Sequence, residues 1–235
     1  MKLDFFPSAV AKFRSGLTFV LVFSLFASQA SAVCLSAFEV TIQVTLLGTK
    51  PGKALKDYSE VVVWLVPVGV LQPASLPREL PRYRMMQHNK MFEPRLLVVP
   101  VGSMVEFRNH DPWFHSAFSF SNSMRFDLGP RGPGGQKAVR FDHPGVAYVF
   151  CDIHPQMEAV VLAVESKYFG VSDKAGHISI GNVPPGRYSL HVWYENATPQ
   201  VLSGLHRVVV LDGNHRNPPR IFIAMAKRVS ITTDN

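Results

Sequence analysis

Three side chains able to bind a metal fall within seven positions of the stretch YVFCDIHPQMEAVVLAV, residues 148–164. They are Cys151, His154 and Met157, spaced C-x-x-H-x-x-M in a break between two apolar runs. His115 lies upstream, in VEFRNHDPWFHSAF. One thiolate and two imidazoles with a weak axial thioether form a ligand set that suits copper in an electron-transfer site. The sequence therefore predicts one copper ion held by these four residues.

The spacing of the ligands has a mechanical consequence. Three ligands on one short loop constrain each other's directions, and His115 would tie that loop to another strand. Pro155 follows His154, stiffens the loop and removes a backbone N–H. A bound metal would keep the Cys151 thiol deprotonated. We expect a constrained site that needs little rearrangement when an electron arrives.

Other interpretations of these residues remain open. A lone buried cysteine is often a small hydrophobic residue. Zinc could bind Cys151 and two histidines, although methionine is a poor zinc ligand. A Cys–His nucleophile lacks an identifiable oriented base and oxyanion hole. In an exported protein, a disulfide between Cys34 and Cys151 is a further alternative.

The region from about residue 86 to residue 164 resembles the cupredoxins, the family of plastocyanin and amicyanin. C-x-x-H-x-x-M matches the amicyanin ligand loop, and NHDPWFH and FEPRLLVVPVGSMVEFRNHD resemble the first histidine loop and the strands before it. The resemblance implies equatorial ligands His115, Cys151 and His154, an axial Met157, and Asn109 and Pro155 around them. Plastocyanin-like proteins usually have asparagine after the first histidine, where this chain has Ser116.

The same residues predict that the chain is not an enzyme. A binuclear copper centre would need a second cysteine in the loop, and a multicopper oxidase would need H-x-H motifs, which the sequence lacks. The resemblance instead implies electron transfer at the His154 edge. Trp113, Phe114 and Pro155 would form the apolar patch there.

The elements that must position these residues are β-strands. Apolar and alternating runs bounded by Gly, Pro, Asn and Asp predict strands at 40–46, 61–66, 96–99, 104–109, 137–141, 147–150, 159–164, 189–194 and 206–211. No helical period continues over three turns. We therefore predict an all-β fold, a cupredoxin Greek-key sandwich with a second small Ig-like or transthyretin-like sandwich.

A second resemblance concerns the flanking segments. GVSDKAGHISIGNVPPGRYSLHVWYE, from residue 170, is similar to the carboxypeptidase regulatory-like β-sandwich, and the stretch from residue 41 is similar to that family's first strands. We expect a discontinuous sandwich of residues 37–72 and 166–225 with the cupredoxin region, 82–165, inserted, and a tail at 226–235. The alternative is a separate N-terminal strand pair.

The N-terminus predicts export. Basic residues precede an apolar run at 16–27, and an A-x-A site indicates a signal peptide, residues 1–32, cleaved after Ala32. An uncleaved anchor is the alternative. We expect a periplasmic protein without a membrane span. Cleavage would lower the formal charge from +7 to +5, because residues 1–32 hold three Lys or Arg and one Asp. That charge favours acidic partners rather than nucleic acid, for which no motif is present.

A methionine-rich stretch, RMMQHNKMF, offers a second set of soft ligands. Met85, Met86, His88 and Met91 could hold Cu(I). On a single strand, Met86 and His88 would share one face while Met85 and Met91 point the other way. Ordinary strand packing is the favoured interpretation.

Taken together, the sequence predicts an exported type 1 copper protein that carries single electrons between redox partners. Two rival functions stay open. The chain could be a copper carrier or storage protein that uses the same ligands, or a structural or polymer-binding β-sandwich whose cupredoxin-like part holds no metal.

Overall fold

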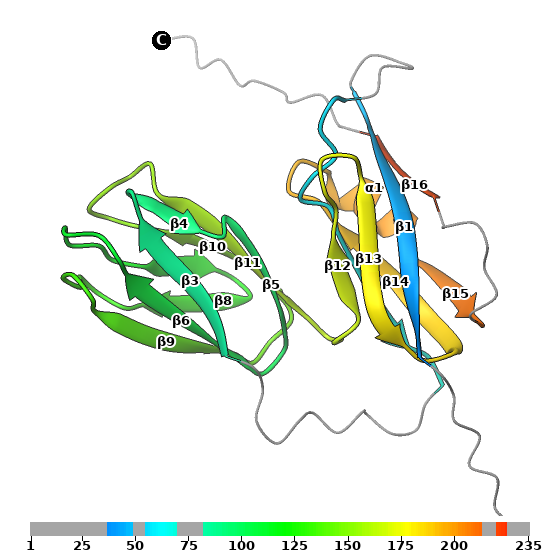
Figure 1. Cartoon of the computed structure of the whole chain (residues 1–235), viewed down its shortest axis with the longest axis horizontal. Coiled ribbons are helices and arrows are strands. Elements are labelled where there is room, and N and C mark those ends of the chain that lie inside the picture. Colours follow the sequence, from blue (N-terminus) through cyan, green and yellow to red (C-terminus); the bar gives the residue numbers. More distant parts are fainter. Residues whose placement is uncertain (1–36, 49–54, 70–81, 213–219, 225–235) are drawn as a thin grey trace, which may run out of the picture. The chain divides into compact units, whose positions relative to one another are not determined.

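The computed structural model describes residues 37–48, 55–69, 82–212 and 220–224. This part of the chain is all-β apart from one short helix, α1 (Pro199–Leu205), which confirms the predicted fold class (Figure 1). The strands are β1 (Phe38–Leu47), β2 (Val62–Pro67), β3 (Arg82–His88), β4 (Met91–Glu93), β5 (Leu96–Pro100), β6 (Ser103–Asn109), β7 (Phe118–Ser121), β8 (Met124–Asp127), β9 (Gln136–Phe141), β10 (Gly145–Phe150), β11 (Glu158–Val164), β12 (Phe169–Val171), β13 (His177–Val183), β14 (Gly186–Trp193), β15 (Arg207–Leu211) and β16 (Arg220–Ala224). The predicted signal peptide and the predicted C-terminal tail lie outside the described residues.

Within the described part of the chain, strands β3 to β11 pair only with one another. They form a five-stranded sheet, β5-β11-β10-β7-β8, and a four-stranded sheet, β4-β3-β6-β9. Alternate side chains of both sheets meet in one apolar core, to which Met85, Phe107 and Val161 contribute. Fully buried residues alternate along β6 with half-buried or exposed ones, which shows why this segment forms a strand with one face on that core. We call this unit the β3–β11 sandwich.

The remaining strands form a second pair of sheets. Their orders are β13-β1-β16 and β12-β2-β14-β15, and Ile42, Leu65 and Leu190 belong to their shared core. Strand β1 pairs antiparallel with β13 and parallel with β16. Strand pairing therefore joins segments that precede and follow the β3–β11 sandwich in the sequence.

Every predicted strand overlaps an observed strand, with ends that differ by a few residues. The predicted ranges do not include β3, β4, β7, β8, β12, β13, β16 or α1. Several of these are short or carry polar and charged residues, as in β7 and β8, so their apolar pattern is weak. Helix α1 has only seven residues and begins at a Thr198 N-cap followed by proline. Such short elements form because neighbouring strands or packing support them.

Strands β3 and β4 form a tight hairpin. His88 pairs with Met91, and the turn between them consists of Asn89 and Lys90, both in the left-handed region with φ of 52° and 56°. Directly opposed residues of an antiparallel pair point to the same face. The expectation that Met91 points away from His88 is therefore wrong, because the chain reverses direction between them. Of the four residues Met85, Met86, His88 and Met91, only Met85 points into the core, where it is fully buried.

Among the described residues, none of the helical segments has the length and apolar character that a membrane crossing requires.

Candidate metal centre

The predicted ligands meet at one end of the β3–β11 sandwich. His115 lies in the connection between β6 and β7, Cys151 directly follows β10, and His154 and Met157 lie in the loop that leads to β11. His115, Cys151 and Met157 are buried with exposed fractions of 0%, 2% and 1%, whereas His154 is partly exposed. The fold thus brings together residues from two distant segments, with one ligand edge at the surface.

The ligand atoms of three residues lie close enough to share one ion. A nitrogen of His115, the Cys151 sulfur and a nitrogen of His154 all lie within 4.8 Å of one another. The Nδ1 atoms of the two histidines face each other at 3.1 Å. Burial and the neighbouring His115 imidazole lower the pKa of His154, so this ring favours the neutral form that binds metals.

The short loop is closed by its own backbone hydrogen bonds. The Met157 N–H donates to the His154 carbonyl at 2.9 Å, and the Cys151 N–H donates to the Met157 carbonyl at 3.3 Å. These bonds hold Met157 beside Cys151 and leave His154 at the outer bend. Pro155 is exposed in the same bend.

A backbone bridge fixes the segment that carries His115. The His115 N–H donates to the Arg131 carbonyl at 3.0 Å, and the Arg131 N–H donates to the His115 carbonyl at 2.7 Å. Asn109 is fully buried, and its side-chain amide donates to the carbonyls of Trp113 and Arg131. Asn109 therefore joins the end of β6 to both strands of this bridge.

Asp111 was missed by the sequence analysis, although it lies four residues before His115. Its carboxylate is 3% exposed, and Oδ2 lies 2.8 Å from His115 Nε2. The N–H groups of Asn89 and Lys90 donate to the same carboxylate at 2.8 and 2.9 Å. Burial alone would raise the pKa of Asp111, but these hydrogen bonds and His115 lower it overall.

This anion decides how His115 presents its ring. Because a carboxylate can only accept, Nε2 of His115 carries the proton and Nδ1 keeps its lone pair. The lone pair points to the side where His154 Nδ1 lies. A carboxylate that fixes the tautomer and ring direction is a recurrent partner of metal-binding histidines.

Ser116 connects the two ligand segments. Its backbone N–H donates to Cys151 Sγ at 3.4 Å, and its hydroxyl oxygen accepts from the Asp152 N–H at 3.0 Å. The hydroxyl also bonds the Asp152 carboxylate. Since a hydroxyl has a single hydrogen, its donation goes to Asp152 rather than to the sulfur 3.7 Å away. Ser116 and Asp152 together connect the segment that carries His115 to the loop that carries Cys151.

Exposed apolar side chains occur in both segments that carry the candidate histidine ligands. Trp113 and Phe114, both predicted for this patch, are 49% and 59% exposed, and Ile153 is 41% exposed beside His154 in the chain. The Lys90 ammonium lies 4.8 Å from the Trp113 ring centroid. Phe114 rests on Gly132, where an added Cβ would lie 3.3 Å from the ring. Ile153 was not predicted, because one apolar residue in a loop gives no pattern.

The chemistry of this donor set fits copper. Thiolate and imidazole bind both copper oxidation states, and a buried thioether favours Cu(I) over zinc. The two ring nitrogens and the sulfur lie within 4.8 Å of one another, a spacing that one cation can bridge.

Comparison with solved structures gave cupredoxin relatives with low scores. A purple cupredoxin from Nitrosopumilus maritimus is 22% identical with a TM-score of 0.32, over 35% of this chain and 99% of that chain. A reduced amicyanin variant is 19% identical with a TM-score of 0.33, over 35% and 82%. A copper-containing nitrite reductase from Thermus scotoductus is 27% identical with a TM-score of 0.35, over 43% of this chain and a quarter of that chain. No protein-family model and no curated protein sequence matches the chain.

Proposed function

We propose that this chain is an exported type 1 copper protein that carries single electrons between redox partners. The observation that carries the proposal is the convergence of His115, Cys151 and His154, whose ligand atoms lie within 4.8 Å of one another. Met157 is buried in the same loop and supplies the weak fourth ligand. Copper bound there would cycle between Cu(II) and Cu(I).

The protein's part in electron transfer is to keep its ligands still. The Asp111 carboxylate holds His115, the Ser116–Asp152 contacts hold the loop, and backbone hydrogen bonds connect Cys151 to Met157. Ligands held in one rigid arrangement cannot adjust to the geometry that Cu(I) or Cu(II) alone would prefer. Little rearrangement would therefore accompany the gain or loss of an electron at a copper ion held by these residues.

The apolar surface at Trp113, Phe114 and Ile153 supports an exit for the electron at His154. Encounters through such a patch are small and transient. The formal charge of +5 that follows removal of residues 1–32 favours a partner with an acidic docking surface. We place the protein in the periplasm and assign it no catalytic reaction of its own.

An absorption spectrum with added Cu(II) tests the proposal. The chain should develop an intense blue or green colour that ascorbate bleaches and an oxidant restores, and Cys151→Ala should stay colourless. A colourless wild-type chain that binds only Cu(I) would instead support copper carriage. A chain that binds no copper would contradict both copper functions and leave a sandwich that acts through its surface.

A further inference from the structure

The outer face of the β3–β4 hairpin carries soft metal ligands that the proposed electron-transfer site does not use. Met86 and His88 lie two residues apart on the outer face of β3, opposite to the buried Met85 and Gln87. Met91 lies directly across from His88 in the antiparallel register and is 52% exposed. We call Met86, His88 and Met91 the Met–His face.

The hairpin geometry sets the spacing of these side chains. Directly opposed residues have Cβ atoms about 4.5–5.5 Å apart, which describes His88 and Met91. Residues two positions apart on a strand are separated by ~7 Å, which describes Met86 and His88. Methionine has three rotatable bonds, so both thioethers can reach an ion beside the imidazole.

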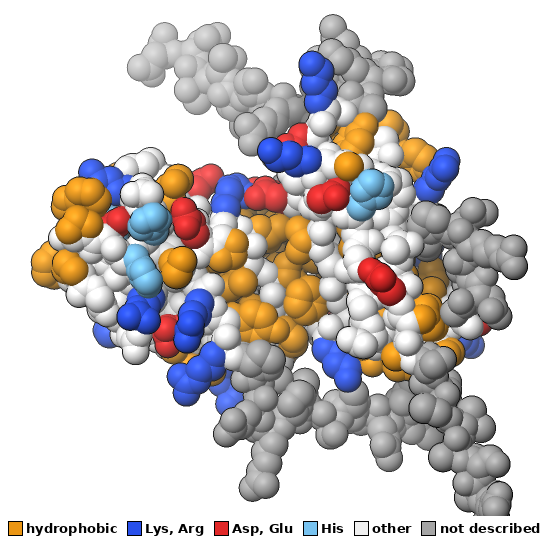
Figure 2. Space-filling view, viewed as in Figure 1, with side chains coloured by type: hydrophobic (Ala, Val, Ile, Leu, Met, Phe, Trp, Pro, Cys, Tyr) orange, Lys and Arg blue, Asp and Glu red, His pale blue; other side chains and the backbone are white. Residues whose placement is uncertain are grey.

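Nearby side chains add to this concentration of donors. The His110 N–H donates to the Gln87 carbonyl at 2.9 Å, which extends the β3–β6 ladder and sets His110 next to His88. Figure 2 shows histidine side chains together with hydrophobic and acidic side chains over the ends of β3 and β6. His88 Nδ1 lies 3.9 Å from Glu93, whose side chain is 44% exposed.

We propose that the Met–His face is a second copper site, specific for Cu(I), separate from the buried centre. Two thioethers and one imidazole are soft donors that suit Cu(I), whereas Cu(II) and zinc prefer imidazole and carboxylate ligands. Binding involves no change of oxidation state: Cu(I) exchanges its previous ligands for the two sulfurs and a nitrogen of His88. The site gives the chain a place to take up Cu(I) at the surface, and it does not depend on the type 1 function.

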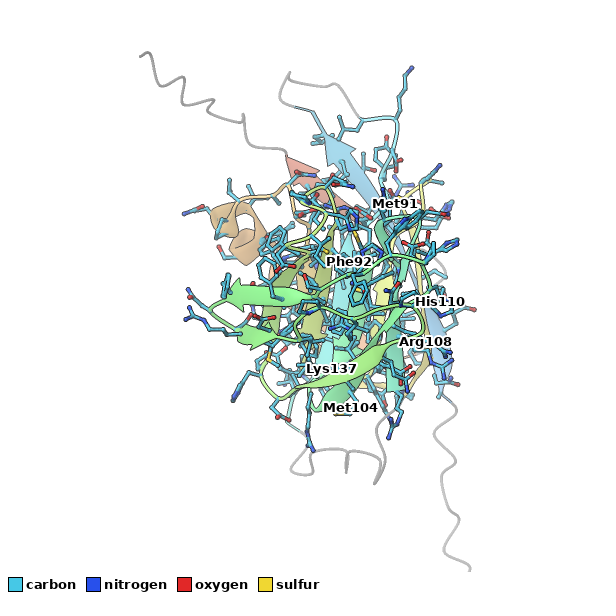
Figure 3. All side chains as sticks on the ribbon, turned by 90° about the vertical axis from the view of Figure 1, so that its left-hand side faces the viewer. Met91, Phe92, Met104, Arg108, His110 and Lys137 are labelled. Carbon is cyan, nitrogen blue, oxygen red and sulfur yellow. The ribbon has the colours of Figure 1, made fainter. Side chains whose placement is uncertain are left out.

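The test is an anaerobic Cu(I) titration against a chromophoric Cu(I) chelator. It uses the chain with Cys151→Ala and His154→Ala, so that the buried centre lacks two ligands. We expect this chain to bind one Cu(I), and we expect Met86→Leu, Met91→Leu or His88→Asn to weaken binding at least tenfold. The matched control is Met104→Leu, which removes a thioether from the same sheet well away from Met91 (Figure 3) and should change nothing.

Methyl NMR identifies the ligands independently of affinity. The S-methyl resonances of Met86 and Met91 should shift with Cu(I) and stay in place with Zn(II), while that of Met104 stays in place with both. Absence of Cu(I) binding in the double variant would overturn the proposal. So would Cu(I) binding that is insensitive to the three face substitutions, or that Met104→Leu weakens equally. The blue colour of the wild-type chain reports the proposed electron-transfer function separately.

Discussion

The Asp111 carboxylate lies 2.8 Å from His115 Nε2, and both side chains are almost completely buried. The two left-handed turn residues of the β3–β4 hairpin donate their N–H groups to the same carboxylate. The hairpin, the Asp111 carboxylate and His115 thus form one connected frame. In this left-handed turn, the N–H groups of both residues point toward the sandwich, where the carboxylate accepts their hydrogen bonds.

Removal of the charge on Asp111 should shift the reduction potential. In Asp111→Asn, the lost negative charge destabilises Cu(II) more than Cu(I), so the potential should rise. Loss of such a histidine partner typically weakens metal binding about 10–100-fold, and a tenfold change in the ratio of Cu(II) to Cu(I) affinity equals about 59 mV. Voltammetry of the copper-loaded chain measures this. Asp142→Asn removes the same charge from an exposed ion pair and should leave the potential unchanged; equal shifts in both variants would show that Asp111 has no special role.

Loss of the Ser116 hydroxyl should destabilise the copper-free chain. Ser116→Ala leaves the Asp152 N–H without its acceptor and removes the hydroxyl's contacts between the His115 segment and the ligand loop, while the bond from the residue 116 N–H to Cys151 remains. We expect the free energy of unfolding to fall by about 1 kcal/mol, the net value of one hydrogen bond. Urea unfolding measures it. Ser116→Thr retains the hydroxyl and should lose less; a larger loss in the threonine variant would show that the pocket's size, and not the hydrogen bond, matters.

Polar substitution of the apolar patch should slow electron transfer without a change in potential. Phe114→Ser removes the most exposed aromatic side chain of the patch beside His154, so two copies of the chain should form their encounter complex less well. We expect the self-exchange rate to fall about tenfold, which corresponds to ~1.4 kcal/mol. NMR line broadening in mixtures of Cu(I) and Cu(II) chain measures it. Phe222, similarly exposed at 54% but on β16, provides the control; an equal effect of Phe222→Ser would contradict the assignment.

Tyr188 should respond to alkaline pH. Burial, together with the charge of Tyr168, raises its pKa to about 12, and its hydroxyl donates to the Pro184 carbonyl at 2.7 Å. An unfolded tyrosine ionises near pH ~10, so the stability that Tyr188 contributes is complete below that pH. It is lost as the pH rises towards 12. Ultraviolet titration of the wild type should show one tyrosine ionisation near pH 12 that is missing from Tyr188→Phe. If the ionisation that is missing from the variant lies near pH 10, the prediction is wrong.

Residue types and spacing were enough to predict that Cys151, His154 and Met157 share one short loop. Local bonds hold this loop, such as that from the Met157 N–H to the His154 carbonyl. The longer strands were predictable for a related reason: alternation along β6 or an apolar run along β11 records burial directly in the sequence. These features depend on neighbours in the chain.

Tertiary structure decided what depends on chain reversal and on burial of charge. Met91 joined His88 only because a two-residue turn folds β4 back onto β3. From the sequence, Asp111 is indistinguishable from an ordinary turn residue. In the fold, the hairpin amides and His115 surround its carboxylate, and a carboxylate is stable in the interior only with such partners. The parallel pairing of β16 with β1 likewise joins segments more than 170 positions apart, as in Gln43 and Arg220. No local pattern encodes contacts at that distance, because they gain their energy only when the whole sheet assembles.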